Sequence, residues 1–128
     1  MASALKKVLI VEDSKTNLTL LKDLVERVCM CEVHTADDGE TAVEMARTLT
    51  LDLILMDVGL PGMDGIEALR VIRSRPEGEQ IPALALTGYA SDQDRKRLLS
   101  SGFNGYLAKP FDLPKLLSIL SGYLETRI

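Results

Sequence analysis

Five short apolar segments alternate with longer amphipathic segments, and this alternation constrains the fold more than any other feature of the sequence. The expected strands span residues 7–11, 31–35, 51–56, 83–86 and 105–108. Between them, apolar residues recur at helical spacing, as in the first such segment with Leu18, Leu21, Val25 and Val28. Strands that are apolar throughout are covered on both faces, which is typical of a parallel sheet between two helix layers. The sequence therefore predicts an α/β fold.

Local signals mark where the helices begin. The expected starts are near Ser14, after Asp38, at Asp64, after Ser91 and at Asp112. The third helix is expected to place its apolar residues on one side, namely Ile66, Leu69, Val71 and Ile72. Right-handed crossovers with one reversal of winding favour the flavodoxin-like strand order 2-1-3-4-5. We therefore expect a doubly wound, five-stranded three-layer sandwich.

Length and composition narrow the possible functions. At 128 residues the chain is expected to form one domain over residues 1–128. No apolar run approaches the ~20 residues that a membrane span needs. The net charge of −4 leaves no basic surface for nucleic acid. Because the amino terminus has no apolar core of signal-peptide length, we expect a cytoplasmic protein that binds neither membranes nor nucleic acid directly.

Polar residues stand at the carboxyl ends of four of the expected strands. Glu12 and Asp13 follow the first strand, and Asp57 follows the third. Thr87 ends the fourth strand and Lys109 follows the fifth. In an open parallel sheet, ligands bind outside these ends, where the winding reverses. Since the first and third strands are neighbours in the expected order, we expect all five side chains at one edge of the sheet.

Three carboxylates at one edge repel one another unless a cation lies between them. Magnesium is the candidate, because it takes one or two carboxylates together with water and phosphate oxygens. Asp13, Asp57 and the backbone carbonyl of Gly59 are the expected ligands, with Glu12 acting through a water molecule. A phosphate group would complete the coordination.

A phosphate at this edge gives the other residues distinct roles. Asp57 is a candidate nucleophile that attacks phosphorus and forms an acyl phosphate. The ammonium group of Lys109 would neutralise one phosphoryl oxygen, and the hydroxyl of Thr87 would donate a hydrogen bond to another. Taken singly, each residue is also compatible with a structural role as a loop cap, a strand end or a surface lysine. Their joint occurrence favours phosphoryl transfer.

The chain resembles a response-regulator receiver domain of two-component signalling, in the CheY-like superfamily, over essentially its whole length. The matching segments are residues 8–13, 53–65, 85–87 and 109–111. Two departures are minor, because neither removes a functional group. Leu60 stands where many members have Met, and Gly88 follows Thr87 where Ala or Ser is frequent.

The resemblance implies a role for each residue at the expected edge. Asp57 would be the phosphoacceptor, and Glu12 and Asp13 would place magnesium. Thr87 and Lys109 would sense the phosphoryl group. In this interpretation the chain catalyses its own phosphorylation and dephosphorylation but is primarily a signalling switch.

The same resemblance implies a switch and its partners. Tyr106 matches the aromatic switch residue of the family and would respond to Thr87. A cis peptide bond is implied at Lys109–Pro110. The phosphodonor would be a sensor histidine kinase or a phosphotransfer protein. A downstream protein target would dock on the fourth helix, fifth strand and fifth helix.

Two other functions use parts of the same pattern. A magnesium-dependent phosphatase of the haloacid dehalogenase group forms an aspartyl-phosphate, but it needs a second acid two residues after a nucleophilic Asp on the first strand. Here Asp13 is followed by Ser14 and Lys15. A flavodoxin-like cofactor carrier needs a phosphate-binding first loop, which Glu12 and Asp13 would repel, and the chain has no Trp to stack on a flavin.

The end of the chain and one loop residue lead to further expectations. The last expected helix ends near Ile128, so we expect output by contact, from a free-standing regulator or from a receiver cut from a longer protein. Tyr89, two residues after Thr87, is expected to shield the acyl phosphate from water and slow its hydrolysis. Gly59, two residues after Asp57, offers no hydrogen-bonding group to orient that water.

Overall fold

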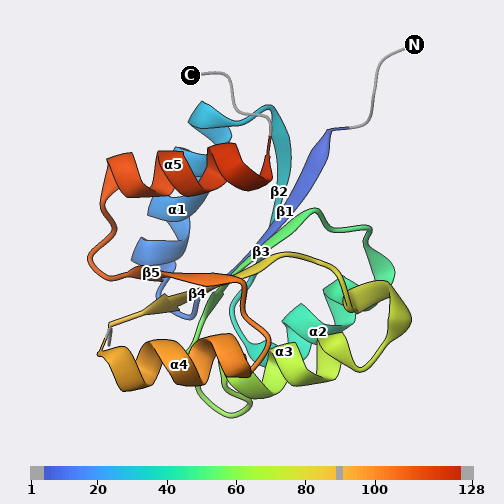
Figure 1. The fold of residues 1–128 in the computed structure, drawn as a ribbon. Helices are drawn as coiled ribbons and strands as arrows, with labels where there is room; N and C mark the ends of the chain where they lie inside the picture. The colour runs from blue at the N-terminus through green and yellow to red at the C-terminus, as the bar shows by residue number, and fades with distance from the viewer. Residues whose placement is uncertain (1–4, 89–90, 125–128) are drawn as a thin grey trace.

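The computed structural model describes residues 5–88 and 91–124, which form a parallel sheet with helices on both faces (Figure 1). The strands are β1 (Lys6–Val11), β2 (Cys31–Ala36), β3 (Leu53–Asp57), β4 (Ala83–Thr87) and β5 (Gly105–Ala108). The helices are α1 (Lys15–Val28), α2 (Gly39–Thr48), α3 (Gly65–Arg73), α4 (Asp92–Ser100) and α5 (Leu113–Tyr123), with a short 3-10 helix, η1 (Pro76–Gly78). Within these described ranges, no helix is both long and apolar enough to cross a membrane.

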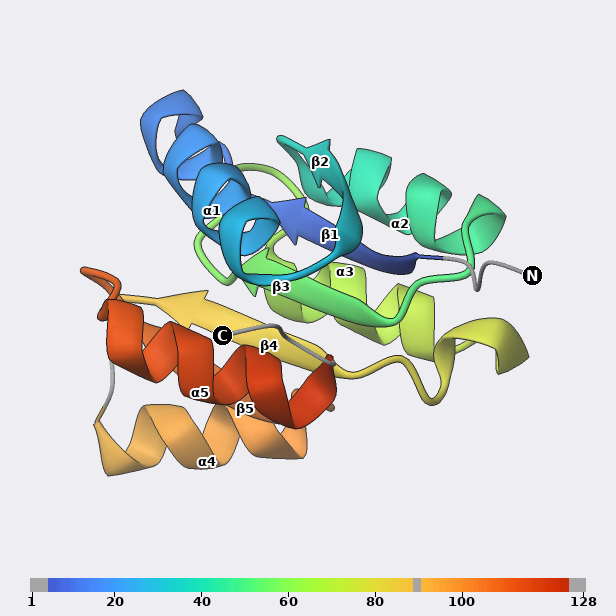
Figure 2. The same ribbon diagram turned by 90° about the horizontal axis from the view of Figure 1, so that it is seen from above.

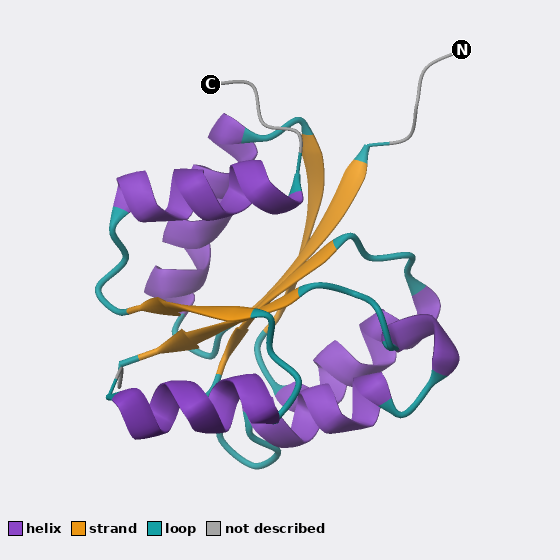
Figure 3. Ribbon diagram, viewed as in Figure 1, coloured by secondary structure: helices purple, strands orange, loops and turns teal. Residues whose placement is uncertain are grey.

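The strand order is β2-β1-β3-β4-β5, and every neighbouring pair is parallel. Helices α1 and α5 cover one face of the sheet, and α2, α3 and α4 cover the other (Figures 1 and 2). Figure 3 shows the strands as a central layer between the two groups of helices. The predicted doubly wound α/β sandwich is therefore confirmed.

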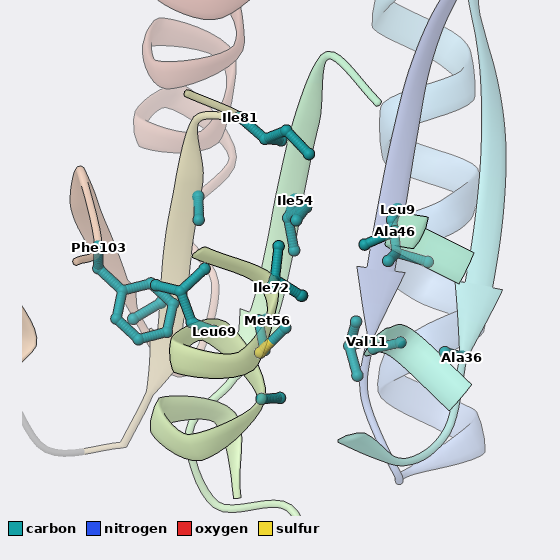
Figure 4. Packing of buried hydrophobic residues seen from close by; sticks show 14 of the residues in the cluster. Leu9, Val11, Ala36, Ala46, Ile54, Met56, Leu69, Ile72, Ile81 and Phe103 are labelled. Carbon is teal, nitrogen blue, oxygen red and sulfur yellow. The ribbon is translucent and has the colours of Figure 1, made fainter. Parts of the chain in front are cut away.

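The core consists of two apolar clusters, one on each face of the sheet. On the face of α2 and α3, Ile54 and Met56 of β3 pack against Leu69 and Ile72 of α3, with Phe103 beside them (Figure 4). Every residue of β3 and β4 is buried. Because burying one large apolar side chain contributes about 1.5–3 kcal/mol, these central strands hold the edge that carries the polar residues firmly in place.

The helices differ in how much apolar surface anchors them. Helix α5 buries Leu116 and Leu120, and Leu124 directly after it is also buried. Helix α4 buries only Leu98 along its length. Its other large apolar residue, Leu99, has 52% of its surface exposed. Helix α4 is therefore the less firmly anchored of the two.

In the described part of the chain, each α-helix begins after a Ser or Asp whose side chain accepts a hydrogen bond from the backbone N–H three residues ahead. These N-cap residues are Ser14, Asp38, Asp64, Ser91 and Asp112. Such a cap contributes about 1 kcal/mol to helix stability. Because each helix follows a strand, the capped N-termini lie at the same edge of the sheet as the carboxyl ends of the strands.

Two sequence predictions are wrong in detail. The third strand begins at Leu53 rather than residue 51, because the Asp52 carboxylate accepts a hydrogen bond from the Lys7 amide (2.8 Å) where the strand would start. Val71 does not lie on the apolar side of α3, since 37% of its surface is exposed. At 3.6 residues per turn, Val71 is rotated by about 160° from the fully buried Leu69, so it lies on the other side of the helix.

At the opposite edge of the sheet, one arginine joins four segments. The Arg73 guanidinium donates six hydrogen bonds, whose acceptors are the backbone carbonyls of Gly78, Glu79, Ile81 and Gly102 and the side-chain oxygen of Asn104. Burial lowers the pKa of Arg73 below its usual range. Arg73 thus links the end of α3, η1, the segment before β4 and the loop between α4 and β5.

Candidate functional site

The register of β1 and β3 brings three carboxylates together. Val11 pairs with Met56, so continuing both strands by one residue sets Glu12 beside Asp57. One oxygen from each of Glu12, Asp13 and Asp57 lies within 4.8 Å of the other two. Glu12 and Asp57 are buried, with 1% and 5% of their surface exposed, whereas Asp13 is exposed. The cluster is therefore open to solvent on the side of Asp13.

Lys109 brings a cation to this cluster from the end of β5. Its Nζ lies 3.0 Å from Oδ2 of Asp57 and 3.0 Å from Oε1 of Glu12. Burial disfavours the charge of Lys109, but its hydrogen bonds to the two carboxylates and their negative charges outweigh burial and raise its pKa. The peptide bond between Lys109 and Pro110 is cis, as the resemblance implied.

The surroundings of the buried Glu12 carboxylate indicate whether the site can bind a metal ion. Burial raises the pKa of Glu12, against the opposing hydrogen bond that the Ser14 amide donates to Oε2 (3.1 Å). Its other oxygen, Oε1, is buried and faces the ammonium group of Lys109, whose Nζ lies 3.0 Å away. A buried carboxylate that shares its ammonium partner with a second carboxylate, next to a third, fits the oxygen ligands of a hard divalent cation.

Both oxygens of Asp57 have one donor each. The Gly59 amide donates to Oδ1 (2.9 Å), and Lys109 donates to Oδ2 (3.0 Å). The start of α3 packs directly against the end of β3. The approach is so close that a Cβ at Gly65 would lie only 2.3 Å from the backbone oxygen of Asp57. Glycine at position 65 therefore lets the helix approach closely enough to support Asp57.

An open pocket of about 560 Å³ lies over the carboxyl ends of β3, β4 and β5. Its described lining residues are Asp57, Val58, Gly59, Thr87, Gly88, Arg97 and Lys109. Thr87 is buried, and its backbone oxygen accepts a hydrogen bond from the Lys109 amide (2.8 Å). The pocket therefore presents a carboxylate, a hydroxyl and an ammonium to one ligand. Tyr89 lies outside the described residues, so its expected shielding role stays a prediction.

Tyr106 lies on β5, apart from this pocket. It pairs with Ala85 of β4, two residues before Thr87, and it is partly buried against the apolar cluster on the α4 side of the sheet. Its hydroxyl accepts a hydrogen bond from Arg95 of α4 (3.3 Å), and the Arg95 guanidinium lies 6.0 Å from the ring centre. Tyr106 thus connects β5 with α4 through its contacts with Arg95.

Sequence reasoning did not single out two arginines of α4, Arg95 beside Tyr106 and Arg97 at the pocket. In the sequence both belong to a charged stretch with no distinctive spacing, so only the rotation of the helix about its axis could identify them.

The fold and this site define a class of protein: a doubly wound domain whose strand ends gather an acidic cluster, a lysine and a threonine. A family model of the response regulator receiver domain matches residues 8–121. The chain therefore belongs to the response regulator receiver domain family.

Two curated relatives illustrate the range of proteins that contain this domain. The chain is 39% identical over 120 residues to the signal transduction histidine-protein kinase BarA of Escherichia coli, covering 91% of this chain but only 12% of that kinase. It is 34% identical over 119 residues to the polar-differentiation response regulator DivK of Brucella anthropi, covering 93% of this chain and 96% of DivK.

Two solved structures are also similar. One is the receiver domain of the sensor histidine kinase PA1611 from Pseudomonas aeruginosa, with magnesium in its active-site cleft (TM-score 0.85, 38% identity, covering 94% of this chain and 98% of that one). The other is the receiver domain of Ssk1 from Saccharomyces cerevisiae, in complex with the histidine phosphotransfer protein Ypd1 (TM-score 0.84, 31% identity, 96% and 91% coverage). Receiver domains thus occur both in kinases and with phosphotransfer proteins.

Proposed function

We propose that the chain is a receiver domain over residues 1–128 that accepts a phosphoryl group on Asp57. The observation that carries this proposal is the position of Asp57, buried beside Glu12 and Asp13 and bonded to Lys109. An oxygen of Asp57 attacks phosphorus of a phosphohistidine, the phosphorus–nitrogen bond breaks, and the imidazole leaves. The product is an aspartyl phosphate, which is a recognised covalent intermediate of Asp.

The other site residues stabilise the transferring group. Lys109 neutralises one phosphoryl oxygen and Thr87 donates a hydrogen bond to another, which places fixed donors where charge develops. Magnesium would be held by Asp13, Asp57 and the Gly59 carbonyl, with Glu12 acting through water. When bound, it would neutralise the crowded carboxylates and polarise a phosphoryl oxygen. Magnesium in the PA1611 receiver supports this choice of cation.

The phosphodonor and the target follow from the same proposal. We infer that a sensor histidine kinase or a phosphotransfer protein supplies the phosphoryl group, which the kinase relative BarA and the Ssk1–Ypd1 complex support. A downstream protein would bind α4, β5 and α5, where Leu99 and Leu113 are exposed by 52% and 45%. Thr87 and Tyr106 would transmit phosphorylation to this surface.

The test uses acetyl phosphate with magnesium chloride and intact-mass spectrometry. The wild-type chain should gain the mass of one phosphoryl group, and Asp57→Asn should gain none. Asp52→Asn is a matched control, because Asp52 precedes the same strand at its other end. Phosphorylation of Asp57→Asn at the wild-type level would refute the assignment of the phosphoacceptor.

A further inference from the structure

Arg97 of α4 lines the phosphoacceptor pocket, which is otherwise formed by the carboxyl ends of strands. All the other described residues that line this pocket belong to β3 or β4, or directly follow β3, β4 or β5. Arg97 belongs to α4 and follows Thr87 by ten residues. It therefore offers this pocket a second cation besides Lys109.

A smaller neighbouring cavity confirms where Arg97 lies. This cavity of about 60 Å³ is lined by Val58, Ile66, Thr87, Asp94, Arg97 and Leu98. It shares Val58, Thr87 and Arg97 with the larger pocket. Arg97 thus lies at the border between the phosphoacceptor pocket and a cavity lined by Ile66 of α3 and Leu98 of α4.

The guanidinium of Arg97 is available to a ligand. Arg47 and Arg95 each form an ion pair with an acid on their own helix, but no described carboxylate lies within 4.0 Å of the Arg97 side chain. The nearest acid in sequence, Asp94, accepts a hydrogen bond from the Ser91 hydroxyl (2.6 Å). An exposed cation at a pocket rim that is not held by a carboxylate is free to bind an anion.

The charge balance of the site creates a need for such a cation after phosphorylation. When ionised, the three carboxylates of Glu12, Asp13 and Asp57 exceed the single ammonium of Lys109 by two charges. A divalent cation balances this excess. The acyl phosphate on Asp57 replaces the single carboxylate charge by about −1.5 to −2 at neutral pH, so the site becomes net negative again. The planar guanidinium of arginine matches two phosphoryl oxygens at once.

We propose that Arg97 binds the phosphoryl group on Asp57 and draws α4 toward the site. This proposal rests on Asp57 being the phosphoacceptor. It gives phosphorylation a direct electrostatic route to α4, separate from the route through Thr87 and Tyr106. Because Leu98 is the only buried residue of α4, few apolar contacts oppose a displacement of this helix.

Beryllofluoride with magnesium is the probe, because it is a tetrahedral anion that binds a carboxylate as a phosphoryl group does. Fluorine NMR measures its dissociation constant in the wild type, Arg97→Gln and Lys96→Gln. Lys96 is the matched control, since it is exposed on the same helix but does not line the pocket. Arg97→Gln should bind beryllofluoride about tenfold more weakly, the loss expected for a charge-assisted hydrogen bond, and Lys96→Gln should bind it as the wild type does.

Two further variants and a second measurement separate binding from a structural role. Arg97→Lys should recover part of the affinity, and Arg97→Glu should bind more weakly than Arg97→Gln. Amide exchange in residues 92–100 should change less on adding the probe to Arg97→Gln than to the wild type. Equal dissociation constants for Arg97→Gln and Lys96→Gln would overturn the role of Arg97. If the wild-type chain does not bind beryllofluoride, or if Asp57→Asn binds it as tightly as the wild type does, the assignment of Asp57 as the phosphoacceptor is overturned instead.

Discussion

Nζ of Lys109 lies 3.0 Å from Oδ2 of Asp57, although 52 residues separate them in the sequence. The same ammonium group is paired with Glu12 of the neighbouring strand end. One cation therefore compensates two buried carboxylates in the absence of metal. Its removal should affect both the folding free energy and the response to metal.

Lys109→Met should destabilise the metal-free chain by about 2 kcal/mol, because two buried carboxylates then repel each other without a counter-charge. Magnesium should restore more stability to this variant than to the wild type. Urea denaturation with EDTA and with magnesium chloride measures both effects. Lys22→Met is the control, since its pair with Glu26 is exposed and is expected to contribute less than about 0.5 kcal/mol. Equal losses in the two variants would contradict the compensating role of Lys109.

Magnesium should raise the melting temperature of the wild-type chain, because the ion binds only the folded acidic cluster. Asp13→Asn should reduce this rise, since one of the proposed ligands is lost. The variant should also be more stable than the wild type in EDTA, because a repelling charge is gone. Asp23→Asn removes an exposed carboxylate from α1 and should leave the rise unchanged. Identical rises for Asp13→Asn and the wild type, measured by differential scanning calorimetry, would exclude Asp13 as a ligand.

The raised pKa of Glu12 predicts how stability depends on pH. The folded chain binds a proton on Glu12 more tightly than the unfolded chain does. The stabilisation from this proton is therefore fully present below pH 4.5, the ordinary pKa of Glu, and is lost as the pH rises through the raised pKa of the folded state. In EDTA, the wild type should therefore lose stability over this range, and Glu12→Gln should lose less. Urea denaturation at a series of pH values measures the difference.

Asp38 provides a control of opposite sign for the pH experiment. Hydrogen bonds from Thr41 lower the pKa of Asp38, so its contribution is present above pH 3.8 and is lost as pH falls through the lowered value. Asp38→Asn should therefore change only the acid side of the curve. The same pH profile for Glu12→Gln and Asp38→Asn would show that burial of Glu12 does not cause the effect.

Arg73→Met should destabilise the fold by about 3 kcal/mol, because it leaves several partly buried backbone carbonyls without a donor. Arg73→Lys should recover less than half of this loss, since one ammonium group cannot reach acceptors on three segments. Arg70→Met on the same helix is exposed and should change stability by less than about 0.5 kcal/mol. Chemical denaturation measures all three. A loss for Arg73→Met no larger than that for Arg70→Met would mean that water replaces the guanidinium.

The sequence predicted the architecture well, because the signals that specify it are local. Strands buried on both faces are apolar throughout, and an N-cap such as Asp64 acts within its own first turn. The strand order then follows from chain length and crossover handedness, and it places Glu12 beside Asp57.

Features that depend on helix rotation or on distant loops could not be predicted in this way. Val71 lies outside the buried face of α3 although its type and position suggested otherwise. The hydrogen-bond acceptors of Arg73 come from three further segments, and no spacing in the sequence indicates that these segments lie together. Arg97 is one charged residue among several on α4, and only the packing of Leu98 turns it toward the pocket.

The single buried leucine of α4 also bears on how such a domain could acquire a new partner. Nearly all of the side chains of α4 face solvent, so substituting them removes little buried apolar surface. The same number of substitutions on α5 would reach Leu116 or Leu120. Duplicated copies of this chain that retain Leu98 and Arg97 could therefore diverge in the proteins they recognise through the rest of α4, while keeping both the fold and the chemistry at Asp57.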